Sequence, residues 1–144
     1  MSASIDFPIL GQNPIPDKPL PPASAVALLR QARVGIAEAE RTPEPAERFA
    51  VAYLAALRGA ATVLALKGRP HRGRAKPTSA WVLLASIAPE LREWAAFFAS
   101  ASSTRAAVLA GITRHVTPRA ADDLVRQADT FVRIVDRIMH EARQ

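Results

Sequence analysis

The chain has 144 residues, no cysteine and a formal net charge of +6. That length fits one domain with a core of its own, and an apolar fraction of 49% with a charged fraction of 22% is typical of a soluble globular protein. The absence of cysteine excludes disulfides and thiolate metal sites. Together with the lack of a secretory signal pattern, it favours a cytoplasmic location.

Residues 1–23 hold half of the chain's 12 prolines. Proline can neither continue a helix nor join a central strand. The sequence therefore predicts an extended, proline-rich N-terminal arm over residues 1–23, followed by a helical domain over residues 24–144.

Two helices are predicted next along the chain. Apolar residues at helical spacing indicate a helix over residues 25–41, with Ser24 as its N-cap. Thr42 is then expected to cap a second helix, with Pro43 at its first position and Gly68 just after its end.

The second helix contains the most apolar stretch of the chain. Residues 49–66 read FAVAYLAALRGAATVLAL, with Leu57 expected on the buried side. A helix that is apolar all round either spans a membrane or lies at the centre of a helical core. Inserting Arg58 into a bilayer would cost about 2.5–3.5 kcal/mol, and the many alanines supply little transfer energy against that cost. We therefore expect the central helix of a soluble bundle and no membrane association.

A ten-residue segment carries most of the net charge and is punctuated by glycine and proline, which predicts a loop. It contains no acidic residue, and its basic side chains are Lys67, Arg69, His71, Arg72, Arg74 and Lys76. Clustered lysine and arginine bind nucleic-acid phosphates by releasing counterions, so these six residues are predicted to bind nucleic acid. The alternative is a solvated loop that contacts nothing specific.

The rest of the chain also predicts helices. One is expected after a cap at Thr78 or Ser79, a second from Pro89, a short one over residues 104–110 ending at Gly111, and a last one capped by Thr117. The buried seam of the last helix is expected at Ala121, Leu124, Ala128, Phe131, Val135 and Ile138. No stretch alternates with period two, so the predicted fold class is all-α: an antiparallel helical bundle of four main helices plus a short extra helix, without a sheet.

Two further kinds of site are considered: base stacking by aromatic side chains and metal binding by histidines. The aromatic side chains stand at core spacing on the predicted helices, which favours burial over base stacking. The three histidines lie far apart, so no metal and no cofactor is expected.

Three runs resemble one known family: ERFAVAYLAALRGAATVLAL, SAWVLLASIAPELREWAAFF and ADDLVRQADTFVRIV. They resemble HEPN domains, and among these a small actinobacterial subfamily. The resemblance implies a helical bundle that forms a homodimer. It also implies the possibility of metal-independent endoribonuclease activity, because many HEPN domains hold the scissile phosphate with an arginine and move the proton of the 2′-hydroxyl with a histidine a few residues further on.

Arg133 and His140 form the only pair in this chain with the family spacing, and they are therefore the predicted catalytic residues. Ile134 follows Arg133 where the family motif has a polar side chain, which favours a non-catalytic member. Three functions remain open: a dimeric, non-catalytic module that binds RNA, a nucleotide or a protein partner; a toxin-like endoribonuclease; and a structural adaptor that binds no nucleic acid.

Overall fold

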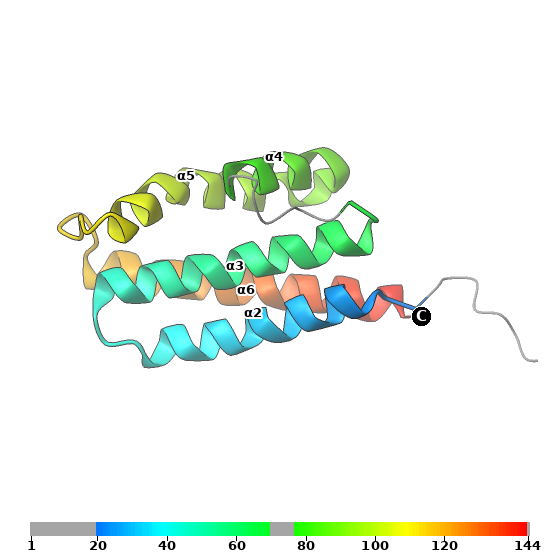
Figure 1. Ribbon diagram of the computed structural model, residues 1–144, viewed down its shortest axis with the longest axis horizontal. Helices are drawn as coiled ribbons and strands as arrows, with labels where there is room; N and C mark the ends of the chain where they lie inside the picture. The colour runs from blue at the N-terminus through cyan, green and yellow to red at the C-terminus, as the bar shows by residue number, and fades with distance from the viewer. Residues whose placement is uncertain (1–19, 70–76, 144) are drawn as a thin grey trace, which may run out of the picture.

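The computed structural model describes residues 20–69 and 77–143. In these residues the chain forms five α-helices and one short 3₁₀ helix, and it has no strand (Figure 1). In chain order these are α2 (Ala23–Arg41), α3 (Pro45–Leu66), α4 (Pro77–Ile87), η1 (Pro89–Leu91), α5 (Arg92–Leu109) and α6 (Pro118–Ala142). The predicted all-α class is confirmed.

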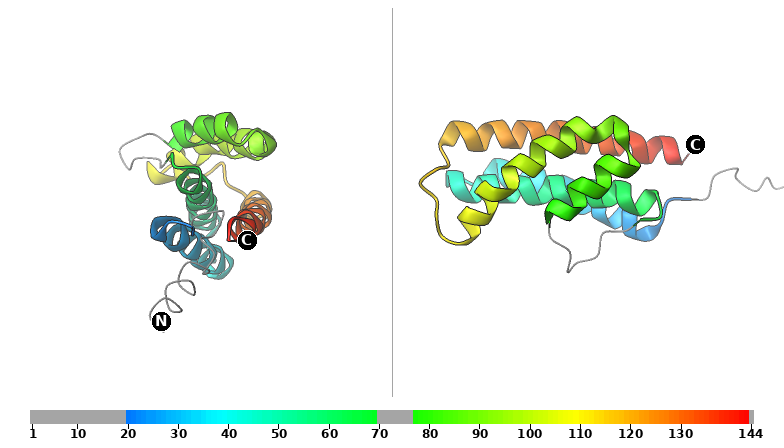
Figure 2. Two further views of the ribbon diagram at one scale, coloured as in Figure 1. Left: turned by 90° about the vertical axis from the view of Figure 1, so that its right-hand side faces the viewer. Right: turned by 90° about the horizontal axis from the view of Figure 1, so that it is seen from above.

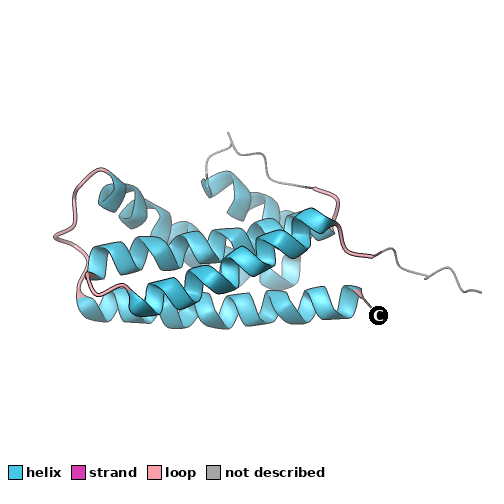
Figure 3. Cartoon of the chain, turned by 60° about the horizontal axis from the view of Figure 1, so that its bottom comes forward, coloured by secondary structure: helices cyan, strands magenta, loops and turns pink. Residues whose placement is uncertain are grey.

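The helices lie in layers around α3 (Figure 2). One layer is formed by α4 and α5, and α2 and α6 lie on the opposite side of α3. Figure 3 shows helices joined by loops throughout the described chain. Of the described helices, only α3 is long and apolar enough to cross a membrane, but most of it is buried among the other helices, as in a soluble protein.

The predicted short helix over residues 104–110 is the C-terminal part of α5, not a separate element. In the structure, the hydroxyls of Ser100 and Ser102 donate to the carbonyls of Phe97 and Ala99, so these serines are satisfied within the helix. Gly111, with φ of +89°, follows the end of α5 as predicted.

Several expected helix starts are wrong. Ser24 lies inside the first turn of α2, whose N-cap is Pro22. Thr42 instead ends α2, because its hydroxyl donates to the Glu38 carbonyl. The N-cap of α3 is Glu44, whose carboxylate accepts from the backbone of Ala46 and Glu47. Pro45 keeps Glu44 out of the helical region, as an N-cap residue requires.

The remaining helix ends are clearer. The N-terminus of α4 is at Pro77, before the expected caps Thr78 and Ser79. The Thr117 hydroxyl caps α6 by accepting from the Ala120 N–H at 3.0 Å, as predicted. Gly68, with φ of +72°, follows the end of α3, which confirms the predicted helix end.

The core is an aromatic cluster where the layers meet. Trp81 of α4 stacks on Phe98 of α5 at 5.1 Å and meets the edge of Phe131 of α6 at 6.1 Å between ring centroids. All three are buried, so their predicted core role is confirmed, whereas Phe97 is exposed. Burial of their apolar surface, not base stacking, accounts for the position of these three rings.

Two details of the predicted seams differ. Leu57 is only half-buried, whereas Leu64 on the same helix is fully buried. On α6, Met139 is buried and Ile138 only half-buried. The buried side of α6 is wider than one seam because the helix packs against both α3 and α2.

Candidate functional site

The two predicted catalytic residues lie on the solvent side of α6. Arg133 and His140 are both exposed, two helical turns apart, next to α2. They line neighbouring hollows of the groove between α2 and α6, which we call the α2–α6 groove.

Arg133 is held by a carboxylate one turn away. Its Nε donates to Asp129 Oδ2 at 3.1 Å, and its side chain remains 77% exposed. The spacing of this pair along a helix is readable from the sequence. A phosphate bound by Arg133 would have to compete with Asp129 for the same guanidinium.

An ion pair crosses the groove between Arg133 and His140. Arg33 of α2 donates to Asp136 of α6, and both side chains are about half exposed. These two residues line both the hollow of about 260 Å³ that contains Arg133 and the hollow of about 100 Å³ that contains His140. The structure thus places the predicted catalytic residues in adjoining hollows with a salt bridge between them.

Sequence reasoning missed Arg33 and Asp136. They are 103 positions apart, and no local spacing connects them. The sequence shows that both residues are charged and lie on predicted helices. Whether they form a salt bridge depends on how α2 packs on α6.

The groove continues toward the other end of α6 with the same balance of charges. A hollow of about 550 Å³ there is lined by Arg48 and Asp122, among others. Arg48 Nη1 donates to Asp122 Oδ1 at 2.6 Å, and Arg126 pairs with Asp123 beside it. The arginines of the α2–α6 groove are therefore largely neutralised by neighbouring aspartates.

Ile134 is half-buried and packs against the hydrophobic core. Its side chain offers neither a donor nor an acceptor. The catalytic motif of HEPN domains has a polar side chain at this position, whereas Ile134 contributes to packing here.

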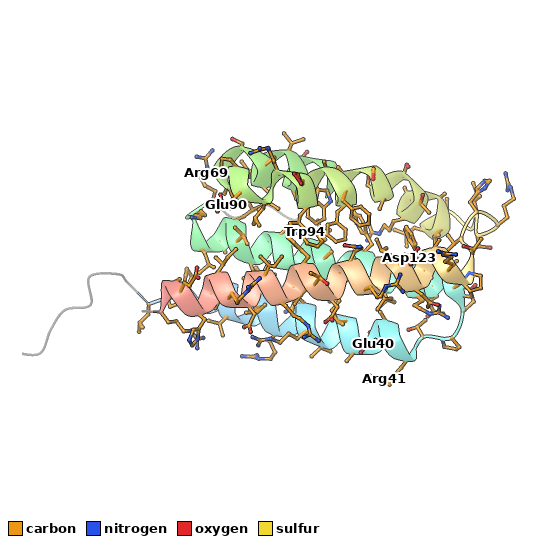
Figure 4. The ribbon with its side chains drawn as sticks, turned by 180° about the vertical axis from the view of Figure 1, so that it is seen from behind. Glu40, Arg41, Arg69, Glu90, Trp94 and Asp123 are labelled. Atoms are coloured by element: carbon orange, nitrogen blue, oxygen red, sulfur yellow. The ribbon has the colours of Figure 1, made fainter. Side chains whose placement is uncertain are left out.

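The predicted nucleic-acid-binding segment begins at the C-terminal end of α3. Lys67 and Arg69 are exposed, and the Arg69 N–H donates to the Leu64 carbonyl at 2.8 Å, which closes the helix end. Figure 4 shows Arg69 at the same end of the molecule as Glu90, while Glu40 and Asp123 lie at the other end. The remaining predicted residues, His71, Arg72, Arg74 and Lys76, lie outside the described residues.

Lys67 lies beside the last turn of α6. It lines an apolar hollow of about 540 Å³ together with Leu66, Ile138, Glu141 and Ala142. The start of the basic segment and the end of α6 that carries His140 are therefore neighbours.

A second polar cluster lies inside the protein, away from the groove. Tyr53 of α3 is fully buried, accepts a hydrogen bond from Trp81, and has the guanidinium carbon of Arg105 5.3 Å from its ring centroid. Burial raises the pKa of the Tyr53 hydroxyl above its ordinary value, against the opposing effects of the Trp81 hydrogen bond and the Arg105 charge. In the described parts of the chain, no three His, Asp or Glu side chains gather as metal ligands.

Comparison with known families identifies the domain. The family model HEPN_SAV_6107, a family of HEPN domains, matches residues 39–136, which is more than half of the chain. The chain belongs to the HEPN family. Arg133 lies inside the matched region of this HEPN domain, whereas His140 lies beyond its end. No curated protein and no solved structure gives a significant match.

Proposed function

We propose that this HEPN protein is a non-catalytic RNA-binding module that acts as a homodimer in the cytoplasm. The observation that carries the proposal is the position of the positive charge: five of the lysines and arginines stand between residues 67 and 76, a segment that contains no acidic residue, against a net charge of +6. Lysine and arginine clusters bind the phosphate backbone through counterion release. The segment starts at the exposed Lys67 and Arg69, where a strand of RNA has free access.

The absence of catalysis is supported by the state of the groove residues. The Arg133 guanidinium already forms a salt bridge with Asp129. The Arg33–Asp136 salt bridge lies between Arg133 and His140. Ile134 supplies no polar group. A nuclease must bring a phosphate-binding cation and a general base to one scissile bond, and these contacts oppose that arrangement.

The proposal is tested by titrating labelled single-stranded RNA with the full chain at several salt concentrations and following fluorescence anisotropy. We expect log affinity to fall linearly with log salt. Replacing Arg69, Arg72 and Arg74 together by Gln should reduce the magnitude of the slope by about 2, because each lost phosphate contact on a single strand contributes about 0.7.

The matched control replaces Arg30, Arg114 and Arg119 by Gln, which removes the same charge from exposed positions elsewhere. Its slope should stay close to that of the wild type. Equal effects of the two triple variants would contradict binding by the basic segment, and a wild type that binds no RNA at low salt would contradict the whole proposal. Competition by a mononucleotide at similar concentrations would point to a nucleotide as the ligand instead.

One observation favours a second candidate function, metal-independent endoribonuclease activity. Arg133 and His140 are both exposed and line adjoining hollows of one groove, so a single RNA strand has access to both. Cleavage would require that the Arg33–Asp136 salt bridge breaks and that Arg133 is released from Asp129. The His140 variant described in the Discussion separates the two functions.

A further inference from the structure

An apolar hollow of about 540 Å³ opens where α3 and α6 end side by side. Leu66 of α3 and Ile138 and Ala142 of α6 line this hollow, and all three are only half-buried. Its volume lies within the range of pockets that hold a ligand. The helices therefore leave apolar surface uncovered at this end of the domain.

The end of the N-terminal arm forms another part of the wall. Leu20, Pro21 and Pro22 line the hollow, directly before α2 begins at Ala23. Leu20 is 77% exposed, so its side chain adds to the uncovered apolar surface. The arm thus joins the domain at the hollow itself.

The sequence of the arm contains one cluster of large apolar residues. Residues 5–10 read IDFPIL, and we call them the apolar segment. In an extended chain successive side chains point to opposite sides, so Ile5, Phe7 and Ile9 would form one apolar side. Such a side is complementary to an apolar hollow.

The linker between the apolar segment and Leu20 is long enough for the segment to reach the hollow. It consists of residues 11–19, whose fully extended length is about 30 Å. The segment must fold back toward Leu20, and Gly11 and the Asn13–Pro14 pair are residues typical of turns. The linker itself holds a single large apolar residue, Ile15.

Tethering favours the apolar segment over any occupant from outside. A short linker gives the tethered segment an effective concentration of about 1 mM, so a dissociation constant as weak as about 1 mM fills the hollow half of the time. A separate ligand at about 1 μM would need to bind about a thousand times more tightly to compete equally. Burial of one phenylalanine and two isoleucines is sufficient for such a weak affinity.

Charge does not oppose this contact. The lining of the hollow contains one cation, Lys67, and one anion, Glu141. The apolar segment contains a single charged residue, Asp6, which alternates with the apolar side chains and would remain on the solvent side. The attraction is therefore expected to come from apolar burial.

We propose that the apolar segment docks in the hollow between the ends of α3 and α6, so that the arm packs against its own domain. The inference depends neither on RNA binding nor on the oligomeric state of the protein.

The test is paramagnetic relaxation of the arm, measured by NMR on the full chain. Because the chain has no cysteine, Glu141→Cys carries a single spin label at the hollow. We expect stronger broadening of the signals of residues 5–10 than of the linker, although the linker is nearer to the domain along the chain. In a tethered arm that does not dock, broadening would instead fall steadily with separation from Leu20.

A matched label and a matched pair of variants serve as controls. Arg119→Cys places the label at an exposed position near the start of α6, about 33 Å from Glu141 along the helix axis, and should leave the arm signals unbroadened. With the label at Glu141→Cys, Phe7→Asp should lose the excess broadening of residues 5–10. Ile15→Asp introduces the same charge in the linker and should retain it. Neither variant changes a residue of the described helices.

The methyl signals of the hollow give a readout that needs no label. Phe7→Asp should shift the signals of Leu66 and Ile138 and leave those of Leu109 unchanged, since Leu109 is 63% exposed at the end of α5. Shifts at Leu109 without shifts at Leu66 and Ile138 would place the docking site elsewhere and overturn the proposal.

A mixed sample distinguishes the chain's own arm from that of a second copy. Spin-labelled chains are combined with separate, isotopically labelled chains, and no broadening between them is expected. Broadening between separate chains would show that another copy's arm fills the hollow, which would overturn the proposal. A profile that falls steadily from the linker to Ile5, or equal effects of Phe7→Asp and Ile15→Asp, would also overturn it.

Discussion

The indole Nε1 of Trp81 donates a hydrogen bond to the hydroxyl of Tyr53 at 2.9 Å. Both side chains are buried, and they join α4 to the central helix α3. Trp81 also packs on Phe98 and Phe131, so this bond lies where three helices meet α4. It fixes how the α4–α5 layer sits on the rest of the domain.

Replacing Tyr53 by Phe should lower the free energy of unfolding by about 1–3 kcal/mol, because the buried Trp81 N–H then lacks an acceptor. Urea denaturation of wild type and variant measures the difference. In a Trp81→Phe background the donor is already absent, and Tyr53→Phe should cost clearly less. Equal costs in the two backgrounds would show that the hydrogen bond is not the cause.

Tyr53 is the only tyrosine of the chain, so the near-ultraviolet absorbance of tyrosinate reports this one residue. Its pKa should lie above the ordinary 10.0 in the folded protein, chiefly because of burial, and return to about 10 in denaturant. The unfolded state then loses this proton before the folded state does. Tyr53 therefore leaves stability unchanged below pH 10 and lowers it as the pH rises from about 10 toward the folded pKa. A folded-state midpoint at or below 10 would contradict the prediction.

Helices α2 and α3 approach closely at Gly35, where an added Cβ would lie 3.0 Å from Ala55 Cβ and 3.5 Å from its Cα. Gly35→Ala should destabilise the protein by about 1–3 kcal/mol through overpacking, although alanine is the better helix former. The double variant Gly35→Ala with Ala55→Gly moves the methyl group across the contact and should recover much of the loss. A more stable Gly35→Ala variant would mean that the helices separate at little cost.

The His140→Ala variant decides between the binding module and the nuclease. Wild type and variant are incubated with structured and single-stranded RNA in the presence of EDTA. The proposed function predicts no cleavage by either protein and RNA binding by both. If the wild type cleaves RNA and His140→Ala does not, with equal thermal stability, the endoribonuclease becomes the function. His140 is exposed on α6, so its replacement should leave stability nearly unchanged.

Local features of the chain predicted several helix ends correctly. Thr117 before Pro118 starts α6, and Gly68 and Gly111 follow α3 and α5, because hydroxyl caps and left-handed glycines act within a few residues of their own position. The cap of α3 was predicted wrongly because Thr42 and Glu44 both precede a proline. Only the structure shows that Thr42 bonds backward to Glu38 and leaves Glu44 to start the next helix.

The family and the fold class were thus determined by the sequence alone, since helical periodicity and the three HEPN-like runs are properties of contiguous residues. Tertiary packing decided everything that depends on two distant segments. It buried Met139 and left Ile138 half-exposed, because α6 meets α2 as well as α3. It joined Arg33 to Asp136 across 103 positions and placed that pair between Arg133 and His140. Spacing along one helix brought those two residues to one face, but which charges lie between and beside them is set by the neighbouring helix.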